Sequence, residues 1–245
     1  MIELLSDPQT YLSLLTLTAL EIVLGIDNIL FISIVSSRLP KELQEKARRL
    51  GLSLALFGRL GLLLSLSWVL SLTKPLFSLL GYELSGRDLV LGIGGLFLIY
   101  KATQEIFFHL EVKDDNSEEK PKLMSMRSAI IQIVMLDIVF SLDSIITAIG
   151  LVSHVAIMAV AIVIAVIVML FFSKHISEFL DVHPSMKVLG LAFLLLVGVL
   201  LVAECFGYPI PRSYIYFSLG FSICVEIINI KHQEYTKKKF LTKKK

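Results

Sequence analysis

Long apolar runs with few charges recur along the chain, and short polar segments separate them. A helix needs about 20 mostly apolar residues to span a bilayer, and the pattern predicts seven such helices. Their ranges are 11–35, 50–72, 89–110, 128–151, 155–173, 188–206 and 213–230. Helices are the expected form because lipid offers no partner to free backbone N–H and C=O groups. The predicted fold class is an all-α polytopic membrane protein.

Composition agrees with this pattern and narrows the surroundings of the chain. Hydrophobic residues make up 56% of the 245 residues and the mean hydropathy is +0.80, which is too apolar for a water-soluble domain. The lipid bilayer is therefore the expected main partner. The net charge of +2 gives no reason to expect nucleic-acid binding.

The positions of Lys and Arg predict the orientation of the helices in the membrane. Of 23 such residues, 18 lie in one set of alternate connecting segments, and the cytoplasmic side of a membrane protein is the one rich in Lys and Arg. These segments are 36–49, 111–127, 174–187 and 231–245. We expect a multi-pass protein of the plasma (bacterial inner) membrane, with the N-terminus outside and the C-terminus in the cytoplasm.

One motif occurs twice, as "LEIVLGIDNILF" at 20–31 and "LDIVFSLDSIIT" at 136–147. The first copy lies in a helix that runs inwards and the second in a helix that runs outwards, so the two copies predict inverted repeats of three helices each. A seventh helix completes the fold. The predicted divisions are a first repeat at 1–110, a cytoplasmic linker at 111–127, an inverted repeat at 128–206, and a last helix with a basic tail at 207–245.

The motif places four acids inside apolar helices, at Glu21, Asp27, Asp137 and Asp143. A single polar residue there is explained by a helix–helix hydrogen bond worth about 1 kcal/mol. Each acid costs roughly 2.5–3.5 kcal/mol on insertion, however, and packing gives no reason to repeat that cost symmetrically. The rise of the antiparallel helices predicts Asp143 level with Glu21 and Asp137 level with Asp27.

Two acids six residues apart point about 240° apart around a regular helix, so they do not share a face. Gly25 and Ser141 lie at matching points between the acids. Glycine permits unusual dihedral angles and serine can bond freed backbone groups. We therefore expect a kinked or unwound stretch at both positions.

The ligand types in the two motifs suit a hard cation. Carboxylates, the Asn28 amide, the Ser144 hydroxyl and freed carbonyls are all oxygen donors, which Mn²⁺, Ca²⁺ and Mg²⁺ prefer. Neither motif contains the His or Cys residues typical of Zn²⁺ sites. No resident cofactor is expected, because the cation would be cargo.

Three further charged residues lie inside predicted helices. Lys101 and Glu105, four residues apart, are spaced for a mutual ion pair, and a part in proton coupling is the alternative. Arg59 lies deep in its helix and suits a counter-charge to the acids or a partner for Glu105. Glu204 and Glu226 fall near helix ends, where either interfacial exposure or a vestibule that attracts cations explains them.

Five segments resemble the TerC family of integral membrane proteins, in its short form without appended soluble domains. They are "LEIVLGIDNILF", "ARRLGL", "GGLFLIYKATQEI", "MLDIVFSLDSIITAIG" and "RSYIYFSLGFSICVEIIN". The resemblance implies a seven-helix fold, manganese export for several members and an association with tellurium resistance. The ion-binding positions that it implies are Glu21, Asp27, Asn28, Asp137, Asp143 and Ser144.

The leading hypothesis is a secondary transporter, not an enzyme, that exports a divalent cation. Mn²⁺ is the preferred candidate ion, and exchange for protons is the candidate coupling route. The alternative is a membrane scaffold of a metal or tellurite stress-response complex without transport activity. An intramembrane aspartyl hydrolase fits less well, because "LGIDN" and "FSLDS" lack the G-x-G-D pattern of such proteases. A homo-oligomer is compatible with the sequence.

Overall fold

The structure, a computed structural model, describes residues 8–79, 82–111, 124–151 and 154–242, and most of them are helical. The elements in chain order are α2 (Pro8–Leu24), α3 (Ile26–Ser37), α4 (Lys41–Leu64), α5 (Leu66–Ser71), β1 (Pro75–Leu79), β2 (Tyr82–Ser85), α6 (Gly86–Glu111), α7 (Met126–Leu151), α8 (Val155–Val182), α9 (Pro184–Cys205) and α10 (Arg212–Thr242). The fold is an all-α bundle with one small hairpin.

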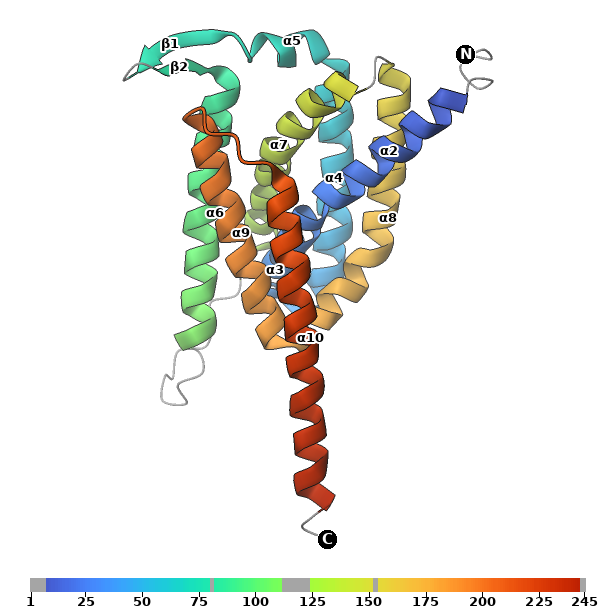
Figure 1. Ribbon diagram of the computed structural model, residues 1–245, viewed down its shortest axis with the longest axis vertical. Coiled ribbons are helices and arrows are strands. Elements are labelled where there is room, and N and C mark those ends of the chain that lie inside the picture. Colours follow the sequence, from blue (N-terminus) through green and yellow to red (C-terminus); the bar gives the residue numbers. More distant parts are fainter. Residues whose placement is uncertain (1–7, 80–81, 112–123, 152–153, 243–245) are drawn as a thin grey trace.

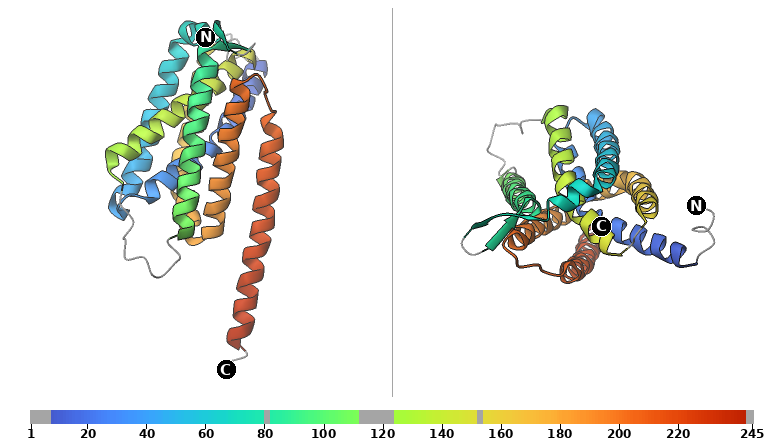
Figure 2. Two further views of the ribbon diagram at one scale, coloured as in Figure 1. Left: turned by 90° about the vertical axis from the view of Figure 1, so that its left-hand side faces the viewer. Right: turned by 90° about the horizontal axis from the view of Figure 1, so that it is seen from above.

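The long helices run between two ends of the bundle (Figure 1). α5, the hairpin and the junction of α9 with α10 lie at the upper end, whereas α6 and α8 end at the lower one (Figure 1). Most residues of α3 and half of those of α7 are buried, and α6 packs along α9. α10 lies beside α9 and extends beyond the other helices at the lower end (Figure 2).

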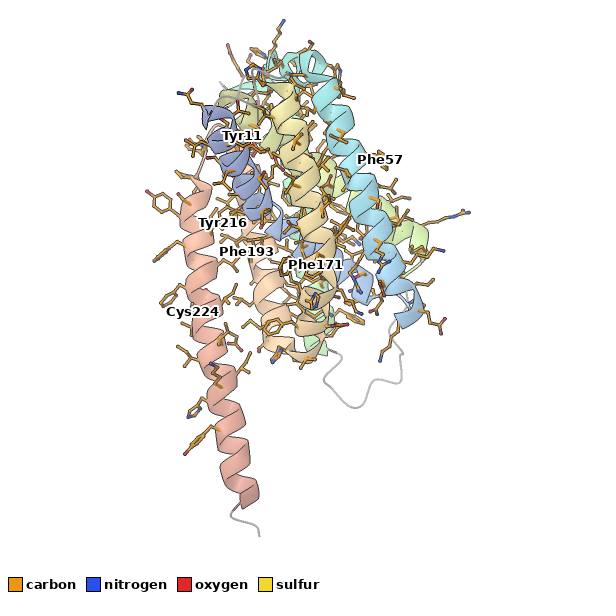
Figure 3. The ribbon with its side chains drawn as sticks, turned by 90° about the vertical axis from the view of Figure 1, so that its right-hand side faces the viewer. Tyr11, Phe57, Phe171, Phe193, Tyr216 and Cys224 are labelled. Atoms are coloured by element: carbon orange, nitrogen blue, oxygen red, sulfur yellow. The ribbon has the colours of Figure 1, made fainter. Side chains whose placement is uncertain are left out.

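Six helical segments of the described chain are long and apolar enough to cross a membrane. They are Gln9–Ser37, Gly86–Phe108, Met126–Ile149, Val155–Val182, Pro184–Cys205 and Ser213–His232. Large side chains on the outside of the bundle are apolar, as Phe57 and Phe171 illustrate at 70% and 68% exposure (Figure 3). Apolar residues facing outwards all round are what lipid requires, so the chain is a polytopic membrane protein.

The predicted span 50–72 differs from the structure. α4 begins earlier, at Lys41, within the charged stretch "KELQEKARR", and it ends at Leu64. Ser65 separates it from the short α5, because the Ser65 hydroxyl and backbone turn back onto the last turn of α4. α4 is therefore absent from the six segments above, although it runs the length of the bundle (Figure 1).

The segment 73–88, treated above as a simple connection, contains an antiparallel hairpin of β1 and β2. Short strands of this kind have no long periodic pattern by which the sequence could reveal them. Most of the predicted linker 111–127 lies outside the described residues, as do the first seven residues and the last three.

The chain bends at Gly25, between α2 and α3. Gly25 keeps helical dihedral angles, and its N–H still donates to the carbonyls of Glu21 and Ile22, at 2.9 and 3.1 Å. A Cβ at this position would lie 2.5 Å from Met169 Sδ of α8, so a larger residue here would require the Met169 side chain to move. The expected distortion is present here as a kink, not as an unwound stretch.

The corresponding prediction for Ser141 is wrong, because α7 runs without a break from Met126 to Leu151. The Ser141 hydroxyl donates to the side chain of Asp137, at 3.1 Å, instead of bonding a freed backbone group. With its backbone ladder intact, α7 has no local cause for a kink.

α6 and α9 touch through glycine backbones. A Cβ on Gly95 would lie 2.7 Å from the carbonyl oxygen of Gly198, and a Cβ on Gly198 would lie 2.9 Å from the carbonyl oxygen of Gly95. Small residues at such crossings let membrane helices pack closely where no hydrophobic effect draws them together.

We predict that Gly198→Ala lowers the stability of the folded protein by about 1–3 kcal/mol, because the added methyl group meets backbone atoms that cannot rotate away. Unfolding in detergent, followed by intrinsic fluorescence, measures this. Gly220→Ala in α10 is the matched control, since no described atom lies within 4 Å of its added Cβ. Equal losses in both variants would contradict the close α6–α9 contact.

Candidate functional site

The buried guanidinium of Arg59 joins two of the motif acids. From α4, its Nη1 donates to Glu21 Oε2 at 2.8 Å, and its Nη2 and Nε donate to Asp137 Oδ1 at 2.9 and 3.2 Å. The three residues are only 2–5% exposed. Since buried charges are tolerated only when they are paired and hydrogen-bonded, this triad fixes α2, α4 and α7 relative to one another. We call it the central cluster.

The polar residues of the motifs complete the central cluster. Asn28 Nδ2 donates to Asp137 Oδ1 at 3.3 Å, and Ser144 lies within hydrogen-bonding reach of the Glu21 side chain. The first copy of the motif therefore meets the second in antiparallel order. This register agrees with the one predicted from helical rise, because Asn28, beside Asp27, contacts Asp137, and Ser144, beside Asp143, lies near Glu21. Arg59 connects these two depths, since it binds both Glu21 and Asp137.

A second arginine holds a second pair of acids. Arg87, at the start of α6, binds Asp143 of α7 through Nη2 at 2.5 Å and also binds Glu204 near the end of α9. Asp143 is buried, whereas Arg87 and Glu204 are about one-fifth exposed. Asp143 thus lies apart from the Arg59 triad, in what we call the upper cluster.

Asp27 borders a small cavity between α3, α9 and α10. Glu204 lines the same cavity, and Phe193 and Tyr216 form an aromatic part of its wall, with ring centroids 6.3 Å apart (Figure 3). Its volume is about 20 Å³, enough for one water molecule. The cavity puts Asp27 and a carboxylate of the upper cluster beside one polar space.

The described residues contain no group of three or more His, Cys, Asp or Glu side chains arranged as metal ligands. In this arrangement Arg59 occupies the space between Glu21 and Asp137, and Arg87 occupies the space between Asp143 and Glu204. The guanidinium groups stand where a cation would have to be to hold these carboxylates together.

Formal charge at these positions is unbalanced. Six carboxylates and two guanidinium groups belong to the two clusters and the cavity, which gives a formal charge of −4 over these eight side chains. The carboxylates belong to Glu21, Asp27, Asp88, Asp137, Asp143 and Glu204, and the guanidinium groups to Arg59 and Arg87. The region therefore carries more acidic than basic side chains.

The structure also decides how the remaining charged residues pair. Of the two roles for Arg59, counter-charge to the acids is the one observed. Glu105 binds Arg38, with 2.6 Å between Oε1 and Nε, and Lys101 donates to Gln104 at 3.4 Å. The predicted Lys101–Glu105 and Arg59–Glu105 pairs are therefore wrong. Arg38 follows α3 and Glu105 lies on α6, so their contact forms only when the chain folds. The spacing of residues along one helix could not predict it.

Sequence reasoning missed Arg87 and Arg38. Each lies at a helix end, where Lys and Arg are common for reasons of topology alone. Glu204 becomes part of the upper cluster, whereas the partner of Glu226 in the structure is local, Asn229 on the same helix at 3.4 Å. A charge at the end of a membrane helix is ambiguous until its partner is known.

Six helices long and apolar enough to cross a membrane place the described chain in the class of integral membrane proteins. The chain belongs to the TerC family, whose model, described as "Integral membrane protein TerC family", matches residues 6–241. No solved structure matches the chain.

Three curated relatives are each 51% identical to this chain over their aligned residues. A UPF0053 protein of Haemophilus influenzae is 51% identical over 237 residues, which cover 97% of this chain and all of the relative. The UPF0053 inner membrane protein YgdQ of Escherichia coli is 51% identical over 92% of this chain and 94% of its own length. The UPF0053 inner membrane protein YoaE of E. coli is 51% identical over 93% of this chain, which spans only 44% of that longer protein.

We predict that Arg59→Met destabilises the protein by roughly 3–5 kcal/mol, the cost of leaving buried charges without their partner. Adding Glu21→Gln and Asp137→Asn to the same chain should restore most of that loss, because the neutral amides no longer need a cation. Unfolding in detergent gives both values. The control is Arg49→Met, whose side chain is 73% exposed. A triple variant as unstable as Arg59→Met alone would assign the loss to packing instead of charge.

Proposed function

We propose that the chain is a secondary transporter of the inner membrane that exports a divalent cation, with Mn²⁺ as the preferred ion. The observation that carries this proposal is the central cluster, in which acids from two copies of one motif meet a buried arginine. A scaffold has no use for such a cluster, and neither does a helix bundle that only needs to be stable.

The packing of the helices supports an inverted repeat in which α4, added to the six segments above, also crosses the membrane. α2 packs against α8 in the same way that α4 packs against α7, and α6 pairs with α9. In such a repeat, α2 with α3, α4 and α6 correspond to α7, α8 and α9. If the two sets are exchanged, the same pairs of helices remain neighbours. Two near-equivalent halves around a central site are the basis of alternating access in many transporters.

The chemistry of the site supports a hard cation as cargo. Glu21, Asp27, Asp137 and Asp143 offer carboxylates, and Asn28 and Ser144 add neutral oxygens. In the cycle that we propose, Arg59 neutralises its two acids when no cation is present. It withdraws when a cation binds, because a divalent ion brings two charges to the same carboxylates in a more compact form. Oxygen donors of this kind suit Mn²⁺.

Export needs a source of energy. Moving two positive charges outwards against an inside-negative potential costs about 4.6 kcal/mol per 100 mV. Carboxylates that exchange a metal ion for protons supply a route, since protons that enter as the metal leaves reduce the charge moved. The orientation with the basic tail in the cytoplasm makes the hairpin end of the bundle the outer end.

We predict that Asp27→Asn and Asp143→Asn each abolish protection of cells against manganese. Replacing a carboxylate ligand should weaken Mn²⁺ binding by about tenfold or more. In cells grown with excess Mn²⁺, elemental analysis should find as much intracellular manganese in both variants as in cells that lack the protein.

The matched control is Glu45→Gln, an exposed acid on α4 that forms a surface pair with Arg49. It should leave intracellular manganese as low as the unchanged protein does. If both site variants keep manganese low, these acids are not the transport site. If loss of the whole protein alters no divalent ion, the transporter proposal fails and the scaffold remains.

We also predict that transport depends on a proton gradient. In proteoliposomes loaded with Mn²⁺, an inward proton gradient should speed the release of Mn²⁺, and an ionophore that collapses the gradient should slow it. A pH-sensitive dye inside the vesicles should report acidification of the vesicle interior as Mn²⁺ leaves. Release without acidification would contradict antiport while leaving metal transport intact.

A further inference from the structure

The α6–α9 pair carries a charge cluster at each of its ends. At the upper end, Arg87 joins the start of α6 to Glu204 on α9 and Asp143 on α7. At the lower end, Glu105 of α6 binds Arg38, which directly follows α3. Between the two ends lies the backbone contact of Gly95 with Gly198.

The lower cluster has a second connection, made by α9. Lys187, near the start of α9, donates to the Ser37 hydroxyl at the end of α3, at 2.8 Å. Lys187 also faces Asp181 at 3.9 Å, and its charge acts on Glu105. The lower end of α3 is thus tied to both α6 and α9, and the Arg38 guanidinium also lies 4.6 Å from the Phe108 ring centroid.

Each cluster therefore ties the α6–α9 pair to one motif helix. The upper cluster holds α7, the helix of the second motif, and the lower cluster holds α3, the helix of the first. Both clusters are half-buried, with side-chain exposures between 8% and 21%. Ion pairs at that depth are strong enough to hold a conformation and accessible enough to open.

We propose that Arg87 and Arg38 are positioning residues that close the two ends of the transport path in turn. The Arg87 cluster closes the outer end and the Arg38 cluster the inner end, while the Gly95–Gly198 contact serves as the pivot. This inference rests on the proposed function, to which it adds the residues that govern access.

The upper cluster is linked to the proposed cation through Asp143. Arg87 and a bound cation compete for the same carboxylate, so a cation on Asp143 frees Arg87 and loosens the outer end. The cavity lined by Asp27 and Glu204 lies directly behind this cluster, on the side of α10. Departure of the cation returns Asp143 to Arg87 and closes the outer end again.

A native cysteine can report the opening of the outer end. Cys205 directly follows Glu204 and packs against α6, since a Cβ on Gly92 would lie 2.8 Å from Cys205 Sγ. Separation of the two helices at this end exposes the thiol. Intact cells treated with a membrane-impermeant maleimide measure that exposure, in a background with Cys224→Ser to remove the exposed second thiol.

Arg87→Gln should raise the labelling rate of Cys205 by about fivefold or more, and Arg38→Gln should lower it by a similar factor, because each change shifts one two-state equilibrium in opposite directions. Arg87→Lys, which keeps the charge, should stay close to the unchanged protein. Arg49→Gln on the exposed face of α4 is the matched control and should have no effect.

The opposite signs separate gating from general loosening. If Arg38→Gln raises labelling as Arg87→Gln does, the two clusters only stabilise the bundle and the inference is overturned. It is also overturned if Cys205 stays unlabelled from outside in every variant. The labelling assay needs neither metal nor a proton gradient. If the two variants shift labelling in opposite directions but the protein does not transport Mn²⁺, the gating inference stands and the proposed transport of Mn²⁺ fails.

Discussion

The bond network of Arg59 with Glu21 and Asp137 is the constraint on which the rest of the interior depends. Each of these groups would be strongly unfavourable alone in a bilayer, and together they are tolerated because each supplies the partner that the others need. α4 must therefore bring a charged residue deep into the bundle. That requirement explains the single charge of Arg59 within the apolar part of α4, whereas the other charges of this helix lie in its first turns.

A buried arginine between two acids is a weak means of stabilising a fold. Replacing such a group with well-packed apolar residues is often neutral or stabilising, because desolvation offsets much of the Coulombic gain. The proposed transport function offers a better reason for the central cluster than stability does. In the proposed cycle, one guanidinium takes the place of a metal ion between Glu21 and Asp137.

How far the sequence reveals this structure depends on the range of the interaction. Apolar runs are local, and six of the predicted spans correspond to helical segments of the described chain that are long and apolar enough to cross a membrane. The span 50–72 is the exception, because the structure has α4 from Lys41 to Leu64 and a separate short α5 there. The motif acids are recognisable because charge is conspicuous in such runs, and Arg59 for the same reason. The Arg87 and Arg38 pairs escape because they join segments far apart in the chain. The hairpin is local, and it escapes because its short strands have no long periodic pattern. The kink predicted at Ser141 is wrong because its hydroxyl donates to the Asp137 side chain, whereas the prediction assumed that it would bond a backbone group.

The kink at Gly25 links the central cluster to the cavity. Asn28 donates to Asp137 in the central cluster, while its neighbour Asp27 faces the cavity that Glu204 also lines. Neighbouring residues on a helix point about 100° apart, so one short stretch of α3 faces both places. In the proposed transport cycle, a cation that leaves Asp137 would next meet Asp27, the neighbour of Asn28, and then Glu204 across the cavity. Under that proposal, the first motif supplies both a ligand of the site and the first step of the path out of it.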